Sequence, residues 1–217
     1  MSVARLVLHA KGVPFAFHDT EEEMYTTQHR QRHPFGRVPV LQHGDFWLYE
    51  TTAIARYVDE AFEGPSLTPT DPRRRAKMNQ WIGNLDAYFY PYMIYHVVHE
   101  RMIFPELGID SDPAVVTHAL PKCEHALSVL EAELSHARAF IVGDRPTVAD
   151  YFLLPTLTAF GFVPEGKEML ERVPMIRGWL ARMAALPSVV EFRATLPRFR
   201  PIEHARRWSQ HHRPGVR

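Results

Sequence analysis

The sequence has a single cysteine, Cys123, among its 217 residues. One thiol cannot form an internal disulfide, and such scarcity is typical of chains that work in a reducing compartment. No apolar run approaches the ~20 residues that a membrane-spanning helix needs, and the N-terminus lacks the long apolar core of a secretory signal. We therefore expect a soluble, cytoplasmic protein with no membrane partner.

An excess of charge of one sign is also missing. The chain carries 25 Lys and Arg residues and 25 Asp and Glu residues, so its net charge does not indicate a nucleic acid partner. Thirteen histidines are present, but no HExxH, CxxC or comparable ligand spacing occurs, and we expect no metal. GxSxG, P-loop and GxGxxG motifs do not occur either, which argues against serine hydrolases and nucleotide-binding enzymes.

What is present is a change of pattern near residue 63. Proline and glycine are concentrated in segment 64–72, which predicts a linker. Before it, the pattern predicts a helix at 2–12, strands at 13–19, 38–42 and 46–49, and a helix at 51–62. After it, the pattern predicts only helices, at 73–103 with a bend near Pro91, and at 113–137, 147–161, 167–186 and 188–194. The sequence therefore predicts an α+β fold, with an α/β domain (1–63) followed by an all-helical domain (73–217) that ends in a basic tail.

The stretch from Gly36 to Val58, GRVPVLQHGDFWLYETTAIARYV, is the candidate binding segment. Pro39 lies within a predicted strand, and a cis bond before it would turn the Val38 backbone toward an extended peptide. Glu50 and Thr51 open the next helix, where unpaired N–H groups attract a carboxylate and Glu50 can hold an ammonium. The alternatives are an ordinary edge-strand proline and a simple N-cap at Thr51 with Glu50 solvated.

The longer segment HPFGRVPVLQHGDFWLYETTAIARYVDEAF resembles the glutathione-binding segment of glutathione S-transferases. The segments ARAFIVGDRPTVADYFLLPTL and VPMIRGWLARMAALPSV resemble the helical-domain signature and the penultimate helix of that family. Within the first, Thr147 and Asp150 predict a structural capping box. The resemblance is to cytosolic members of bacterial type. It implies a thioredoxin-like domain followed by a helical domain, a homodimer, and conjugation of the substrate glutathione to small hydrophobic electrophiles.

The resemblance also assigns roles to five residues of the binding segment. Val38 would pair with the cysteinyl backbone of glutathione beside a cis Pro39. Glu50 and Thr51 would bind the γ-glutamyl head group, and Arg37 is placed to reach the glycyl carboxylate.

A second set of candidates lies on the helix after the linker. Tyr88, Tyr92, Tyr95 and His99 are spaced 4, 3 and 4 residues apart, so they share one face of an α-helix. In the family this helix borders the pocket for the electrophile, and aromatic rings with polar tips suit a flat apolar substrate. The alternative is that these side chains form helical-domain core and dimer contacts.

The catalytic residue is not identified by the sequence. Family members usually begin with a strand and a loop that carries the thiol-activating Ser, Cys or Tyr. Here ARLVLHAKGVPF matches the helix and turn that follow, and we therefore expect the first strand and the catalytic loop to be missing in front of it. We expect a truncated natural sequence, weak conjugation by this chain, and little effect of Ser2→Ala, because Ser2 lies past the usual position. A glutathione-binding pseudoenzyme and an interaction scaffold remain the alternatives.

Overall fold

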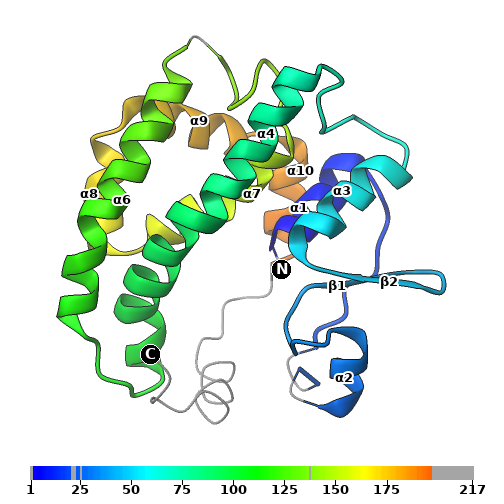
Figure 1. The fold of residues 1–217 in the computed structure, drawn as a ribbon, viewed down its shortest axis with the longest axis horizontal. Coiled ribbons are helices and arrows are strands. Elements are labelled where there is room, and N and C mark those ends of the chain that lie inside the picture. Colours follow the sequence, from blue (N-terminus) through cyan, green and yellow to red (C-terminus); the bar gives the residue numbers. More distant parts are fainter. Residues whose placement is uncertain (1, 21–22, 25, 137, 197–217) are drawn as a thin grey trace.

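The computed structural model describes residues 2–20, 23–24, 26–136 and 138–196, and the basic tail expected at the C-terminus lies largely outside this part of the chain. Figure 1 shows an N-terminal unit with a small β-hairpin beside a larger helical unit. The N-terminal elements are α1 (Ser2–Lys11), α2 (Thr27–Arg32), β1 (Val40–His43), β2 (Phe46–Tyr49) and α3 (Thr51–Ala61). The two strands are antiparallel, with Val40 opposite Tyr49 and His43 opposite Phe46.

The helical unit follows the Pro-rich linker. Its elements are α4 (Pro72–Asn84), η1 (Leu85–Ile103), α5 (Phe104–Glu106), α6 (Pro113–Leu134), α7 (Val148–Phe160), α8 (Pro164–Glu171), α9 (Pro174–Ala184) and α10 (Pro187–Ala194). Five of these helices, α4, α6, α8, α9 and α10, begin with proline. Proline suits this position because its fixed φ is helical and its missing N–H would have had no helical partner. The sequence thus sets the helix starts locally.

The two units share one continuous hydrophobic core. In the helical unit η1 packs against α6 and α7, and α1 of the N-terminal unit packs against α3, α7 and α10. Figure 1 shows α1 lying between α3 and the group formed by α7 and α10. Among the described residues, no helix has the length and apolar character needed to cross a membrane. The packing fixes α1 and the hairpin relative to η1, which is what forms the site described below.

Two predictions about secondary structure are wrong. Residues 13–19 form no strand, although Val13 and Phe15 pack against the core as alternate residues of a strand would. Among the described residues the only sheet pairs β1 with β2, and strand-like residues without a hydrogen-bonded neighbour do not make a stable strand. The helix predicted at 73–103 is divided, because α4 gives way at Leu85 to the π-helix η1.

The capping box predicted at the start of α7 is confirmed. The Asp150 carboxylate is fully buried and accepts from the Thr147 N–H at 2.8 Å and the Thr147 hydroxyl at 2.9 Å. It also accepts from the Ile141 N–H at 3.1 Å and from Trp179 Nε1 on α9 at 2.8 Å. Burial raises the pKa of Asp150, and these donors oppose that rise. One carboxylate therefore ties the start of α7 to the preceding loop and to α9.

Candidate functional site

A cavity of about 540 Å³ opens between the N-terminal unit and the helical unit. One wall comes from α1, from the loop before β1 and from the start of α3, and the other comes from η1 and α7. The lining residues of the first wall are Ser2, Val3, His33, Arg37, Val38, Pro39, Glu50 and Thr51. The lining residues of the second are Leu85, Asp86, Tyr90, Pro91, Ile94, Tyr95, Phe152, Pro155, Thr156 and Ala159. All five residues of the predicted binding segment thus meet in one place.

The loop before β1 is held by a histidine that the sequence analysis did not single out. His29 is fully buried, and its Nε2 lies 2.8 Å from the carbonyl oxygen of Arg37. The following Val38–Pro39 peptide bond is cis, as predicted. His29 therefore anchors the backbone that presents Arg37 and Val38 to the cavity.

Glu50 has an unusual backbone at the start of α3. Its φ is +72° and its ψ is 121°, a region that non-glycine residues seldom occupy and that is found most often at binding and active sites. Glu50 is the N-cap of α3, but its side chain makes no capping hydrogen bond, and Thr51 is the first helical residue. The alternative of an N-cap at Thr51 is therefore wrong, and the Glu50 carboxylate is not used to cap the helix.

The charged groups around the cavity influence one another. Burial raises the pKa of Asp86, and the Glu50 carboxylate raises it further. Burial lowers the pKa of His33, Glu50 opposes this shift, and His29 and Arg37 add to it. His33 is itself buried, and its Nδ1 has no hydrogen-bond partner among the described residues. The cavity thus combines one guanidinium, two carboxylates from opposite walls and an imidazole whose charged form is disfavoured.

The predicted second-substrate set is only partly brought together. Tyr95 lines the cavity, whereas Tyr88, Tyr92 and His99 do not. Tyr88 is 59% exposed, and Tyr92 stacks on His96 with 5.5 Å between ring centroids and lies under Lys122 Nζ. The cavity wall instead takes Tyr90 and Pro91 from η1.

The cause of this difference is the helix type. In η1 the hydrogen bonds run from residue i to i+5, which widens the turn and changes the angular step per residue. Side chains spaced 4, 3 and 4 then no longer keep to one face. Residues four or five apart share one face of η1, and Asp86, Tyr90 and Tyr95 accordingly line the same cavity. The spacing of apolar and aromatic residues does not distinguish a long π-helix from an α-helix. The sequence therefore could not have predicted η1.

Cys123 and Ser2, which carry a thiol and a hydroxyl, lie in different surroundings. Cys123 is buried within α6, and burial raises its pKa to about 12, so it supplies no thiolate at neutral pH. Ser2, by contrast, lines the cavity at the first turn of α1. Ser2 belongs to the same wall as Val38, Glu50 and Thr51, although counting along the sequence had placed it beyond the usual position. Within the described part of the chain, no group of three or more His, Cys, Asp or Glu side chains is arranged to hold a metal ion.

Comparisons with known proteins agree with this architecture. Family models described as the N-terminal and C-terminal domains of glutathione S-transferase match residues 1–66 and 113–182. "Glutathione S-transferase 3" of Zea mays is 30% identical over 200 residues, which are 88% of this chain and 87% of that protein. The chain belongs to the glutathione S-transferase family. Because this relative is a plant protein, the bacterial type expected from the sequence is not confirmed.

Solved structures of the family superpose on both units of the fold. The apo structure of glutathione S-transferase III has a TM-score of 0.81 and 27% identity, and the match covers 92% of this chain and 93% of that one. Glutathione S-transferase-I bound with lactoylglutathione has a TM-score of 0.78 and 26% identity, over 90% of this chain and 93% of that one. The two-domain arrangement, thioredoxin-like and then helical, is therefore that of the family.

Proposed function

We propose that this protein binds glutathione in the cavity and conjugates it to small hydrophobic electrophiles. The observation that carries the proposal is that one cavity joins the predicted peptide-binding residues to an aromatic wall. In the reaction the glutathione thiolate attacks the electrophilic carbon, the C–S bond forms, and the leaving group departs with the electron pair of its bond. The protein holds both reactants in contact and favours the thiolate. The related transferase bound with lactoylglutathione supports a glutathione derivative as ligand.

The roles of the first wall follow from charge and position. Glu50 supplies a carboxylate for the ammonium of the γ-glutamyl head, and Thr51 supplies a hydroxyl and the first N–H of α3 for its carboxylate. Arg37 is the cation on this wall and suits the glycyl carboxylate. The Val38 backbone, between Arg37 and Pro39, is left to pair with the cysteinyl residue. Under this arrangement the thiol points toward α1 and the aromatic wall.

Ser2 is the group that we assign to thiol activation. A thiol with a pKa of about 8.5 is only a few per cent ionised at neutral pH. Ser2 combines a hydroxyl donor with the N-terminal end of α1, whose dipole favours a nearby anion. This proposal departs from the expectation from the sequence that Ser2→Ala would have little effect, and the variant below decides between the two.

We expect Ser2→Ala to lower the conjugation rate at pH 7 by about tenfold or more, while glutathione affinity changes less than about twofold. Turnover of a chlorinated nitroaromatic and calorimetric titration with glutathione give the two values. Ser66→Ala is the matched control, because Ser66 is exposed and bonds its own linker, at Thr68 O. A rate that falls no further in Ser2→Ala than in Ser66→Ala would contradict the assignment.

The same two measurements on the unaltered protein separate the enzyme from its alternatives. Glutathione binding together with turnover is the expected result. Binding without turnover of any of a panel of aryl and benzyl halides would instead indicate a pseudoenzyme. Neither binding nor turnover would leave a scaffold function, since the fold alone does not determine activity.

We also propose a homodimer in the cytoplasm, with domain boundaries at 1–63 and 73–217 around the linker 64–72. Phe46 and Trp47 support the dimer, because they expose apolar surface on β2. Light scattering at micromolar concentration is expected to give twice the chain mass of 25.1 kDa. Replacing Trp47 with glutamate should shift the mass toward that of one chain, and a chain that is monomeric throughout would contradict the proposal.

A further inference from the structure

Four rings, three on η1 and one on the first residue of α5, form a continuous ladder that begins inside the cavity. Tyr90 meets Tyr95 edge to face, with 5.1 Å between ring centroids. Tyr95 meets His99 at 5.3 Å, and His99 meets Phe104 at 5.8 Å, both again edge to face. Tyr90 and Tyr95 line the cavity, whereas His99 and Phe104 lie beyond it. We call Tyr90, Tyr95, His99 and Phe104 the aromatic ladder.

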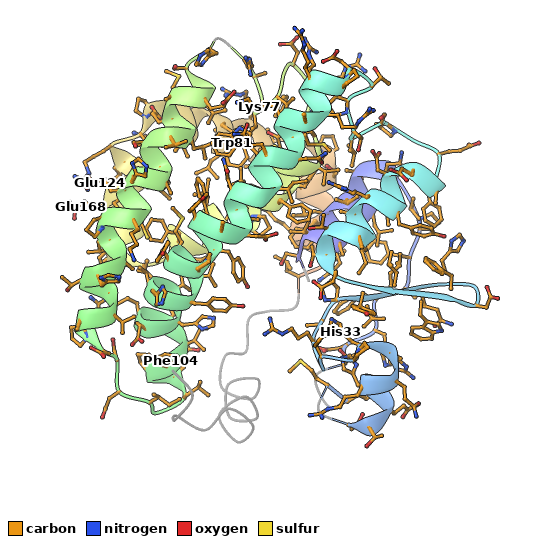
Figure 2. The ribbon with its side chains drawn as sticks, viewed as in Figure 1. His33, Lys77, Trp81, Phe104, Glu124 and Glu168 are labelled. Atoms are coloured by element: carbon orange, nitrogen blue, oxygen red, sulfur yellow. The ribbon has the colours of Figure 1, made fainter. Side chains whose placement is uncertain are left out.

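The ladder follows from the geometry of η1. Its members are spaced 5, 4 and 5 residues apart. This spacing keeps Tyr90, Tyr95 and His99 on one side of η1, whose hydrogen bonds run from i to i+5, and Phe104 follows at the start of α5. The opposite side is the core side, where Phe89, Met93 and Val97 are fully or almost fully buried. Figure 2 shows Phe104 at the end of this helix, far along it from α4, with His33 of the cavity wall across from it. The ladder therefore leads away from the cavity along η1.

Exposure distinguishes the ladder from packed core, and the absence of charge suits its rings to an apolar ligand. Tyr90 and Tyr95 are 39% and 44% exposed, and His99 and Phe104 are partly exposed. Burial lowers the pKa of His99 to about 4, so its ring is uncharged at neutral pH. Four uncharged rings that are continuous with the proposed second-substrate pocket offer contact area to an aromatic ligand at every step.

We propose that the aromatic ladder extends the second-substrate pocket, and that the preferred electrophiles are elongated molecules with a second aryl group beyond the reacting one. The inference rests on the proposed function. An electrophile with one ring contacts only the rings inside the cavity, at Tyr90 and Tyr95. A second aryl group, joined by a short linker, reaches His99 and Phe104. The ladder is continuous with the cavity, which is why a substrate, and not a partner protein, is its assigned occupant.

The test compares two glutathione conjugates that differ only in length. S-benzylglutathione and S-(4-benzyloxybenzyl)glutathione share the peptide and the benzylic sulfur bond, and calorimetry measures both at pH 7 without requiring turnover. The unaltered protein is expected to bind the longer conjugate about tenfold more tightly. In His99→Ala and Phe104→Ala this preference should fall by about three- to tenfold, the range of one lost aromatic contact. His99→Phe should keep the preference, because it keeps a ring.

Tyr88→Ala is the matched control, because Tyr88 is an exposed tyrosine of the same helix outside both the cavity and the ladder. It should leave the preference unchanged. The proposal for the ladder would be overturned if the unaltered protein bound both conjugates with equal affinity, or if the preference for the longer conjugate remained in both alanine variants. Either result would leave the proposed function intact. If neither conjugate binds, the proposed function fails as well. The preference for the longer conjugate could also disappear at protein concentrations where light scattering reports dimers. That result would mean that a second copy of the chain covers the ladder, and it would also overturn the proposal.

Discussion

Replacing Asp150 with alanine is expected to lower the free energy of unfolding by about 3–5 kcal/mol, the cost of breaking a buried network of charge-assisted hydrogen bonds. The carboxylate is fully buried and accepts from the Thr147 N–H and hydroxyl, the Ile141 N–H and Trp179 Nε1. Without it these donors lose their acceptor in a place where water does not replace it. Because they belong to the start of α7, the preceding loop and α9, the loss affects the packing of the helical unit.

Urea unfolding measures this effect, and an unchanged m-value would show that the same transition is being compared. Asp144→Ala is the control, because Asp144 is exposed in the loop that precedes the same helix. It should change the stability by no more than about 0.5 kcal/mol. Asp150→Asn, which keeps one acceptor oxygen, should lie between the two. A loss for Asp150→Ala as small as that for Asp144→Ala would contradict the account of the network.

Glutathione affinity is expected to fall by about ten- to a hundredfold in Glu50→Gln. The substitution keeps the size of the side chain and removes the charge that we propose holds the ammonium, and hydrogen bonds to charged groups contribute about 1.5–3 kcal/mol. Glu60→Gln is the matched control, because Glu60 is an exposed glutamate on the same helix and does not line the cavity. Calorimetric titration of the three proteins gives the comparison.

A glutathione analogue without the γ-glutamyl amino group isolates the interaction. If Glu50 acts on the ammonium, the analogue should bind the unaltered protein and Glu50→Gln with nearly equal affinity, because the partner of Glu50 is already missing. An analogue that loses a further tenfold or more in Glu50→Gln would mean that Glu50 acts elsewhere. In that case Asp86, whose pKa is raised by burial and by Glu50, is the other carboxylate that lines the cavity.

The grouping of the residues on the first cavity wall could be predicted from the sequence because it is local. Arg37, Val38, Pro39, Glu50 and Thr51 lie within 15 residues of one another, and their geometry depends on a proline, a hairpin and a helix start. Each of these features has its own signal in the residues that form it. The same is true of the capping box at Thr147 and Asp150 and of the helices that begin at proline.

The aromatic wall could not be predicted in the same way. Its residues on η1 depend on the angular step of that helix, and an α-helical step selected Tyr88 and Tyr92 in place of Tyr90 and Pro91. Its residues on α7 are distant in sequence and meet η1 only through tertiary packing. The run at 13–19 shows a related limit, because a strand depends on a neighbour as much as on its own residues.

The measurement that tests the central claim most directly is a crystal structure of the protein with S-benzylglutathione. The account predicts the γ-glutamyl head at Glu50 and Thr51, the cysteinyl backbone along Val38, and the glycyl carboxylate toward Arg37. It also predicts the sulfur near Ser2 and the benzyl ring against Tyr90 and Tyr95. A conjugate bound outside the cavity, or with its benzyl group against Arg37 and its peptide along η1, would contradict it.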